Sequence, residues 1–492
     1  MKTRARRVTA VVVVLVCATA WWAWRSGTAE RLLGGMADRA GPNPACTPLS
    51  DVTPAACAIP AVTGTDGPGL AVPTPDSTNT PAAEPTVVVL VPLAESGAAA
   101  TPQPTVVVML PLAESGEQPV EPEGVIGGPY LGNVTRTSAH VSWVTRGEGP
   151  GAVRFWQQGQ AAREARADTL STPAGIWHEA VLTALRPGEL CTYTLAAAGG
   201  PEHAFVTAPD DGRPFTFLAL GDTRPGDRTA AQPTDMARAV AAQVAGREFV
   251  FALHNGDIVA EGGRCEGELS GWEQYRRAYL NLFGATLARA PFYLTPGNHD
   301  MAWGTCGMEI FKGVFALPDQ TPGEGRESYY SFDWGNLHVI SLNTNEPVGP
   351  GSAQYEWLEG DLAANRQQWT VVQFHEAVYT SGDHEAFLPA RESWVPLFER
   401  YGVDLVFNGH NHTYERTCPI KAGACTTRAD GGVVYVVTAG AGPALHDSTG
   451  AWFSVLHLSL HHFVTVHIDG NRLELSAWNW QGQLFDRYVM TK

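Results

Sequence analysis

Six apolar, strand-like runs of this chain each end in a short polar or glycine-rich cluster. The clusters are Gly221-Asp222, Gly256-Asp257, Gly297-Asn298-His299-Asp300, His375-Glu376, Gly409-His410-Asn411-His412 and Gly440-Ala441-Gly442. Five of them carry carboxylate, amide or imidazole groups, a mixture that suits hard or borderline divalent cations. In open α/β folds the loops at the carboxyl ends of the strands form the site. We therefore expect these distant segments to meet around bound metal.

The runs belong to a region, residues 213–492, in which strand and helix signals alternate. Apolar runs of buried-strand length cover residues 215–220, 249–253, 292–295, 370–374, 403–407 and 433–437, and a helical pattern covers 234–245. The last stretch, 461–490, alternates again around the turn signal Asp469-Gly470-Asn471 and predicts a closing hairpin. Together these signals predict one α/β domain.

A different pattern precedes that domain, over residues 126–210. Apolar and polar residues alternate with a period of two in 139–143 and again in 191–195, which predicts an all-β sandwich. Two functions are open for this part. It could form a wall or a contact with a cell-surface partner, or it could be a spacer packed on the domain that follows it.

The first 125 residues read as an export segment and a linker. Residues 1–25 combine basic residues with an apolar run, which fits a cleaved signal peptide or a retained membrane anchor. Residues 26–125 are rich in Pro, Ala and Thr, which predicts a disordered stalk. Within it, segment 85–97 recurs as 104–116, a tandem repeat with an offset of 19 residues. Both readings of the export segment place the rest of the chain outside the cytoplasm, secreted or tethered to the membrane.

The cysteines and the net charge restrict the cellular compartments and the classes of binding partner that are possible. Three local disulfide pairs are plausible: Cys46 with Cys57, Cys265 with Cys306, and Cys418 with Cys425. Cys191 is left without a partner in this scheme. The alternative is that the cysteines are reduced, buried thiols. The formal net charge of -17 argues against nucleic-acid partners, because these require a basic face. An anionic substrate must be attracted locally, by metal or by single arginines.

The order of the polar clusters resembles the calcineurin-like metallophosphoesterases. Residues 329–343, Trp357-Leu358 and 412–416 are similar to purple acid phosphatase sequence, and residues 126–210 resemble a fibronectin type III module, so that the layout is that of purple acid phosphatases. The resemblance covers about 280 residues plus that module. It implies a mixed α/β (α+β) four-layer β-sandwich flanked by helices, preceded by the all-β sandwich and the stalk.

The resemblance also implies which residues hold two divalent or trivalent metal ions, Fe, Zn or Mn. One ion takes Asp222, Asp257 and His412, and the other takes Asp257, Asn298, His375 and His410. A carboxylate can bridge two cations about 3.5 to 4 Å apart, a spacing that suits attack on phosphorus. Asp257 is accordingly expected to be the shared ligand.

Further residues are assigned catalytic or substrate-binding roles by the same resemblance. His299 is expected to face the phosphoryl group and to stabilise it or protonate the leaving oxygen, with Asp300 orienting its ring. His384 and Tyr379 lie in a run expected at the rim of the pocket, where they would contact substrate, and Tyr414 is a weaker candidate.

One departure from the family affects the first metal. Most members supply a third ligand, either a His two residues after the first Asp or a Tyr three residues after the bridging Asp, and here those positions hold Arg224 and Ala260. Water, Asp227 or Glu261 could fill the gap. Arg224 could instead clamp substrate phosphate, or it could form a salt bridge with Asp227 or another acid.

The function expected from these features is extracytoplasmic hydrolysis of small phosphate esters by a dinuclear metal site. Monoesters are favoured over diesters on resemblance alone. The alternative is a surface binding or adhesion protein that retains the fold and has lost its chemistry, because Arg224 and Ala260 replace usual ligands. A third possibility is an enzyme that holds one tight metal only.

Overall fold

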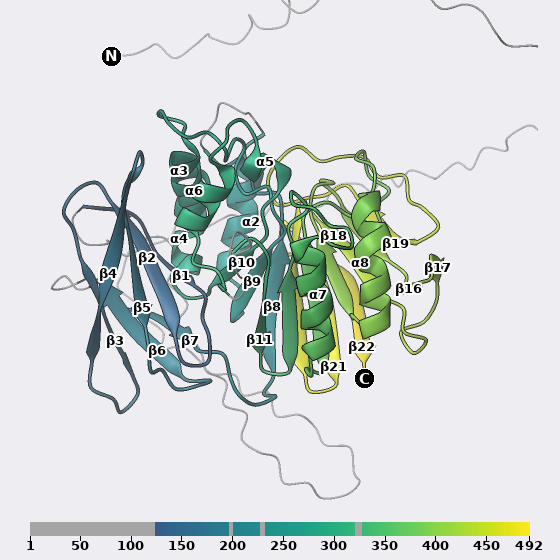
Figure 1. Cartoon of the computed structure of the whole chain (residues 1–492), viewed down its shortest axis with the longest axis horizontal. Helices are drawn as coiled ribbons and strands as arrows, with labels where there is room; N and C mark the ends of the chain where they lie inside the picture. The colour runs from purple at the N-terminus through teal and green to yellow at the C-terminus, as the bar shows by residue number, and fades with distance from the viewer. Residues whose placement is uncertain (1–123, 196–199, 227–231, 320–326) are drawn as a thin grey trace, which may run out of the picture. The chain divides into compact units, whose positions relative to one another are not determined.

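The computed structural model describes residues 124–195, 200–226, 232–319 and 327–492 (Figure 1). The predictions of an export segment, of a stalk with its tandem repeat, and of the Cys46 and Cys57 pair lie outside these residues. None of the described helices is long and apolar enough to cross a membrane.

The described residues between 124 and 209 form antiparallel β-strands, as the alternation predicts. Its strands pair in the order β1-β2-β5-β4-β3-β6-β7. They are β1 (Val125–Gly132), β2 (Ala139–Thr145), β3 (Ala152–Gln157), β4 (Arg163–Thr172), β5 (Gly175–Leu182), β6 (Leu190–Leu195) and β7 (His203–Val206). Trp143, Cys191 and Tyr193 are fully buried, since alternate side chains of a strand point to one face. Membership of the fibronectin type III family stays a prediction.

Two mixed sheets form the part after residue 213. The first has the order β10-β9-β8-β20-β21-β22 and the second the order β11-β12-β13-β14-β18-β15-β19. The first contains β8 (Phe215–Leu220), β9 (Phe251–His254), β10 (Phe292–Leu294), β20 (His462–Asp469), β21 (Arg472–Asn479) and β22 (Leu484–Thr491). The second contains β11 (Tyr330–Trp334), β12 (Leu337–Ser341), β13 (Trp369–Phe374), β14 (Leu405–Asn408), β15 (Tyr414–Thr417), β18 (Val434–Thr438) and β19 (Ser454–Leu458); β16 (Ile420–Lys421) and β17 (Ala424–Cys425) pair separately.

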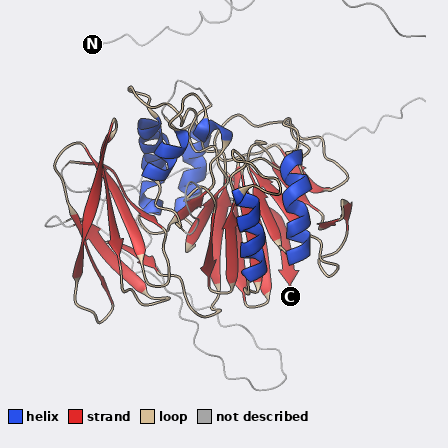
Figure 2. Cartoon of the chain, in the orientation of Figure 1, coloured by secondary structure: helices blue, strands red, loops and turns tan. Residues whose placement is uncertain are grey.

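Helices occupy the connections between these strands (Figure 2). They are α2 (Asp235–Ala245), α3 (Gly271–Gln274), the π-helix η1 (Tyr275–Leu280), α4 (Asn281–Leu287), α5 (Asn298–Met301), α6 (Gly307–Val314), α7 (Ala353–Ala364) and α8 (Leu388–Tyr401). Helix α2 begins where Thr234 caps it, with the Thr234 side chain accepting from the Ala237 N–H, close to the start that the sequence predicts.

The predicted four-layer arrangement is confirmed. The two sheets pack face to face, and the ring of Phe217 on β8 meets that of Phe407 on β14 edge to face at 6.5 Å. A second core on the other side of the second sheet contains Leu358 of α7 and Trp394 of α8, and Figure 1 shows these two helices covering that sheet. Helix α2 buries its apolar face on the first sheet.

The sandwich contacts the two-sheet domain through buried tyrosine hydroxyls. Tyr130 of β1 donates to the carbonyl of Val314 at 2.8 Å, and Tyr293 of β10 donates in the other direction to Val134 at 2.8 Å. Buried hydroxyls that find carbonyl partners stabilise an interface, since an unpaired one would cost free energy. These contacts favour the role of a spacer packed on the domain.

Two of the predicted cysteine pairs are disulfides in the structure. Cys265 is bonded to Cys306 and Cys418 to Cys425, while Cys191 is a buried free thiol. The first bond joins the segments that follow the second and third polar clusters. It therefore holds two loops of the candidate site together.

Candidate metal centre

Parallel pairing brings the polar clusters to one edge of each sheet. Strand β9 pairs in parallel with β8 and β10, and β13, β14 and β18 are parallel to one another. The carboxyl ends of parallel strands meet at the same edge of a sheet, so the residues that follow them become neighbours. The predicted ligands lie at these ends.

Three of the predicted ligand residues have a left-handed backbone. Their φ angles are 59° for Asp222, 52° for Asp257 and 71° for His410. Non-glycine residues adopt this conformation rarely, and they keep it only where the surroundings hold them. Here the Asp222 N–H donates to the carbonyl of Gly256 at 3.0 Å, and the Arg224 N–H donates to that of Asp257 at 3.1 Å. The backbones of the two aspartate loops thus fix each other.

His375 lies at the centre of the cluster and is fully buried. Its Nε2 is 3.3 Å from Oδ1 of Asp257, 3.0 Å from Oδ1 of Asn298 and 3.2 Å from Nδ1 of His410. Its Nδ1 donates to the carbonyl of Asn255 at 2.8 Å, because a carbonyl can only accept. Nε2 therefore faces the other predicted ligands, and the neutral ring would direct its lone pair at them, as a metal-binding imidazole requires.

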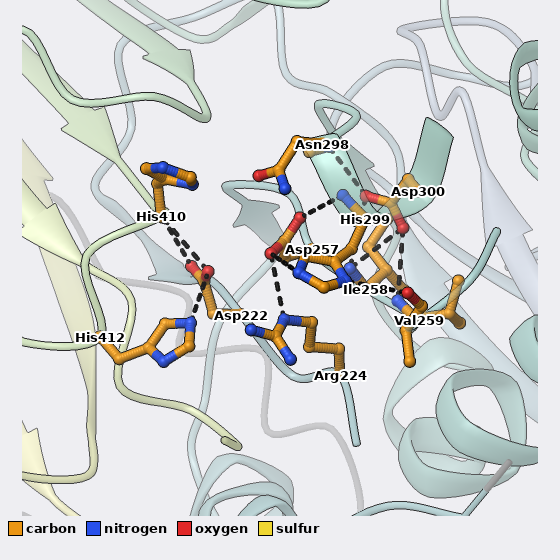
Figure 3. Close-up of polar contacts among 12 residues, drawn as sticks. Asp222, Arg224, Asp257, Ile258, Val259, Asn298, His299, Asp300, His410 and His412 are labelled. Carbon is orange, nitrogen blue, oxygen red and sulfur yellow. Dashed lines mark hydrogen bonds and ion pairs between the residues drawn. The ribbon is translucent and has the colours of Figure 1, made fainter. Parts of the chain in front are cut away.

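His412 is held in the same way beside the first aspartate. Its Nε2 is 3.5 Å from Oδ1 of Asp222, and its Nδ1 donates to the carbonyl of Ala444 at 2.7 Å. Two hydrogen bonds join His412 to His446. The backbone N–H of His412 donates to Nδ1 of His446 at 3.1 Å, and the backbone N–H of His446 donates to the carbonyl of His412 at 3.1 Å. Figure 3 shows His410 and His412 on either side of Asp222.

The donor set fits divalent cations. Ligand atoms of Asp222, Asp257 and His412 lie within 4.8 Å of one another, and all three residues are buried. The Asp257 carboxylate also contacts His375, so it lies between the two predicted metal positions. Carboxylate oxygen, amide oxygen and neutral imidazole are the ligands that Zn, Mn and Fe share.

The buried groups of the cluster shift one another's pKa. Burial alone would lower the pKa of His375, but the charges of Asp257 and Asp222 raise it, so a cation that binds there must displace a proton. Burial raises the pKa of Asp222 well above its usual range, and the charge of Asp257 raises it further. Burial also raises the pKa of Asp257, but the charges of His375, His299 and Arg224 outweigh it and bring that pKa to about 2. Burial lowers the pKa of His410 to about 2, which keeps its imidazole neutral. A bound cation is the partner that would let both buried carboxylates ionise together.

Two glycines leave space that a side chain would fill. A Cβ at Gly409 would lie 2.4 Å from the carbonyl of Asn255 and 2.7 Å from Oδ2 of Asp222. A Cβ at Gly297 would lie 2.3 Å from Oδ1 of Asp257. Both distances are shorter than side-chain atoms tolerate, so these positions require glycine for close approach to the ligands.

The prediction for His299 and Asp300 is wrong in one respect. The sequence predicts that Asp300 orients the His299 ring, yet Nδ1 of that ring donates to the carbonyl of Ala260 at 2.8 Å. Asp300 is fully buried and accepts instead from the backbone N–H groups of Ile258 at 3.1 Å and Gly297 at 2.8 Å, as Figure 3 shows for Ile258. It therefore joins the second and third clusters through their backbones. His299 itself lies at the site, with its N–H 2.9 Å from Oδ1 of Asp257.

Arg224 contacts the central carboxylate. Its Nε is 3.1 Å from Oδ2 of Asp257, and its side chain is 14% exposed, so it faces the cluster and not open solvent. Glu261, a predicted substitute ligand, is paired with Arg264 instead. Asp227, the other predicted substitute and the predicted partner of Arg224, lies outside the described residues.

The secondary candidates separate into one residue near the site and two in the core. The His384 ring lies 4.3 Å from that of His410, and His384 is exposed. Tyr379 is a correction: it is buried in the second core beside Tyr435, because its apolar ring packs better there than at a wet rim. Tyr414 is also buried, and its hydroxyl donates to Asp486 at 2.6 Å.

Sequence reasoning missed the residues that orient the ligands. His446 stacks on His412 with ring centroids 4.0 Å apart and follows the sixth cluster, Gly440-Ala441-Gly442, by four residues. A histidine at that distance is the one signal that could have found it. The carbonyls of Asn255, Ala260 and Ala444 leave no such signal, because every residue type carries one.

Comparison with known proteins places this site in a family. Residues 215–414 match the calcineurin-like phosphoesterase family, so the chain contains a metallophosphoesterase domain of that class. Within the class it is similar to purple acid phosphatases: it is 30% identical over 278 residues to purple acid phosphatase 21 of Arabidopsis thaliana, covering 53% of this chain and 59% of that protein.

Other relatives and a solved structure extend the comparison. An uncharacterized protein of Mycobacterium tuberculosis is 29% identical over 282 residues, covering 48% of this chain and 52% of that protein. A probable inactive purple acid phosphatase of Arabidopsis thaliana is 28% identical over 220 residues, covering 39% and 34%. The chain thus spans about half the length, or less, of the first curated relatives. A purple acid phosphatase from yellow lupin seeds shares the fold, with a TM-score of 0.64, 22% identity and coverage of 76% of this chain and 74% of that one.

Proposed function

We propose that this protein is an extracytoplasmic hydrolase of small phosphate esters, with monoesters favoured over diesters, that uses two bound metal ions. The observation that carries the proposal is the position of Asp257, whose carboxylate lies between His375 on one side and the Asp222 and His412 group on the other. Such a shared carboxylate is what a two-metal hydrolytic site requires. The similarity to purple acid phosphatases supports the same class of reaction.

The residues that would hold the ions are the six that converge at the strand ends: Asp222, Asp257, Asn298, His375, His410 and His412. Bound ions would lower the pKa of a water molecule and neutralise charge on the phosphoryl oxygens. Fe, Zn and Mn all suit these ligands.

His299 is proposed to handle the proton of the leaving group. Its Nδ1 carries a hydrogen donated to Ala260, so the neutral ring presents a lone pair on Nε2. Only the imidazolium form can donate from Nε2. In hydrolysis the bond from phosphorus to the leaving oxygen breaks and a bond from phosphorus to a water oxygen forms. That water loses one proton to solvent, and the leaving oxygen takes the His299 proton. Burial lowers the pKa of His299, so this form requires acid conditions.

Arg224 is proposed to stabilise the developing phosphoryl charge. A guanidinium keeps its charge and presents several donors in a planar fork, and Nε uses one of them on Asp257. The remaining donors can contact phosphate oxygens. His384 is proposed to contact the substrate from the other side of the site, next to His410.

The extracytoplasmic location rests on two features. The disulfides between Cys265 and Cys306 and between Cys418 and Cys425 are of a kind that persists in oxidising compartments. The export segment predicted at residues 1–25, as a cleaved signal or a retained tether, agrees with that location.

The test is a comparison of wild type with Asp257→Asn. The purified protein is analysed for bound metal by mass spectrometry and assayed on a phosphomonoester and a phosphodiester. We expect two ions per chain in the wild type, and loss of metal and of at least about 100-fold in kcat in the variant. Asp404→Asn serves as the matched control, because Asp404 is a buried aspartate paired with Lys492 away from the site. Metal-free wild type, or turnover unchanged in Asp257→Asn, would refute the proposal.

A second candidate function is a surface binding protein without chemistry. Arg224 on Asp257 favours it, since a guanidinium beside the shared carboxylate opposes a cation there, and a relative is named as probably inactive. The same experiment separates the two functions. Wild type that binds metal but hydrolyses neither ester would support the binding protein.

A further inference from the structure

An exposed tryptophan stands beside the candidate site in a strained backbone conformation. Trp303 follows helix α5 by two residues, is 43% exposed, and has a φ of 62°. A bulky residue in the left-handed region is a genuine outlier, and such strain gathers at functional sites. Single exposed apolar side chains are common on protein surfaces, so the strained backbone is the feature of Trp303 that calls for a reason.

The loop around Trp303 is held firmly from the opposite side. The N–H of Gly263 donates to the carbonyl of Ala302 at 2.9 Å, and the N–H of Cys306 donates to the carbonyl of Gly263 at 3.2 Å. The disulfide between Cys265 and Cys306 closes the same two segments. The exposure of Trp303 is therefore a fixed feature of the surface and not the result of a loose loop.

The indole lies against the residue proposed to protonate the leaving group. The ring centroids of Trp303 and His299 are 5.3 Å apart with an interplanar angle of 31°. The His299 ring donates from Nδ1 to the carbonyl of Ala260 at 2.8 Å, which fixes the imidazole against which the indole lies. A leaving group that takes a proton from His299 approaches an imidazole whose ring centroid is 5.3 Å from that of the Trp303 indole.

We propose that Trp303 is a specificity-determining residue that selects phosphate esters whose leaving group carries a flat aromatic ring. This inference rests on the proposed function and names the substrate class of the same site. Indole faces stack on other aromatic rings, and a stack beside the bond that breaks favours an aryl ester over an alkyl ester. The nearby acid His299 and the stacking ring then act on the same part of the substrate.

The experiment compares metal-loaded wild type with Trp303→Gly and Trp303→Phe, on phenyl phosphate and on ethyl phosphate. Glycine adopts a positive φ at no steric cost, so Trp303→Gly removes the ring and spares the loop. We expect kcat/KM for phenyl phosphate to fall about tenfold in Trp303→Gly and to be largely kept in Trp303→Phe. The value for ethyl phosphate should change by less than about twofold. Trp480→Ala is the control, since Trp480 is 40% exposed and lies in the turn after β21.

Binding of unreactive analogues provides a readout that does not depend on turnover. Calorimetry should show that wild type prefers phenylphosphonate to ethylphosphonate, and that Trp303→Gly loses this preference. Two outcomes would overturn the role of Trp303 without affecting the proposed hydrolase. In the first, Trp303→Gly loses kcat/KM equally on both esters and keeps the preference for phenylphosphonate. In the second, Trp303→Gly loses kcat/KM on neither ester. A wild type that hydrolyses neither ester refutes the proposed function, and the phosphonate preference then decides the role of Trp303 alone. Failure to bind either phosphonate overturns both.

Discussion

Nε of Arg224 lies 3.1 Å from Oδ2 of Asp257, so a guanidinium pairs with the proposed shared carboxylate from the position where relatives of this class are expected to supply a histidine ligand. The contact is largely shielded from solvent, and its charge helps to lower the pKa of Asp257. Arg224 thus has two effects: it offers donors to a phosphoryl group, and it competes with a cation for one carboxylate oxygen.

Replacing this arginine by a ligand should strengthen metal binding. We expect Arg224→His to raise the affinity of the first metal position about tenfold or more, because a neutral imidazole adds a ligand and removes a repelling charge. Arg224→Gln, which removes the charge without adding an imidazole, is the comparison. The measurement is metal content after dialysis against graded chelator. Equal metal retention in the two variants would contradict a ligand position at residue 224.

Adding one methyl group at Gly409 should disrupt the site. The new Cβ would meet the carbonyl of Asn255 at 2.4 Å and Nδ1 of His375 at 2.8 Å, and both belong to the contact that orients this ligand. We expect Gly409→Ala to lose bound metal and about 100-fold or more in activity, since misplacing a reacting group by 1 Å has that effect. The control is Gly360→Ala in helix α7, where a Cβ meets nothing within 4 Å. That change should leave metal content unchanged and stabilise the helix by about 0.5–1 kcal/mol.

Removing the Asp300 carboxylate should loosen two loops at once. It accepts from the N–H groups of Ile258 and Gly297 and from the hydroxyl of Tyr275 at 3.1 Å, all buried. Leaving such donors unpaired costs about 1–3 kcal/mol each, so we expect Asp300→Ala to lower the free energy of unfolding by about 3 kcal/mol or more. Asp300→Asn keeps an acceptor oxygen and should lose less. Chemical denaturation measures both, and equal effects of the two changes would show that the hydrogen bonds contribute little.

Stability should fall at alkaline pH because of a histidine far from the metal centre. Nδ1 and Nε2 of His338 lie 2.7 Å from Asp333 and 2.8 Å from Asp361. Burial alone would lower the pKa of His338, but the hydrogen bonds to these two carboxylates outweigh it and raise the pKa to about 9. The folded state therefore holds this proton more tightly than the unfolded state does. The added stability is complete below pH about 6.5 and is lost as the pH rises through about 9.

The loss over this range should be about 3 kcal/mol, because one pKa unit corresponds to about 1.4 kcal/mol. Urea denaturation at pH 6 and at pH 9.5 measures it. His338→Gln has no proton to lose and should show a smaller difference between the two pH values. A wild-type difference no larger than that of the variant would mean that the charge of His338 does not stabilise the fold.

Much of the framework could be predicted from the sequence because it depends on local patterns. The run 215–220 is β8, and the helix expected at 234–245 is α2, which begins at Asp235. The strand before His375 was predicted to within one residue. An apolar run of strand length predicts a buried strand, and the polar cluster after the run indicates where the strand ends. Parallel pairing brings the predicted ligands to one edge of each sheet, and the packing of the two sheets against each other brings the two groups together.

Roles within the cluster were harder to predict, because they depend on which side chain faces which. Tyr379 lies only four residues after the ligand His375, yet its ring turns into the second core. Asp300 is adjacent to His299 in sequence but contacts the backbone of a different loop. The distance between two residues in the sequence does not determine the directions of their side chains, and neighbouring residues in a turn can point to opposite sides.

The sequence by itself determined the types and order of the predicted metal ligands, since these are side chains with their own chemistry at the ends of recognisable strands. Only the tertiary structure decided how those groups are oriented. The carbonyls of Asn255, Ala260 and Ala444 set the tautomers of His375, His299 and His412. A carbonyl is the same in every residue, so its position in space, and not its identity in the chain, carries the information.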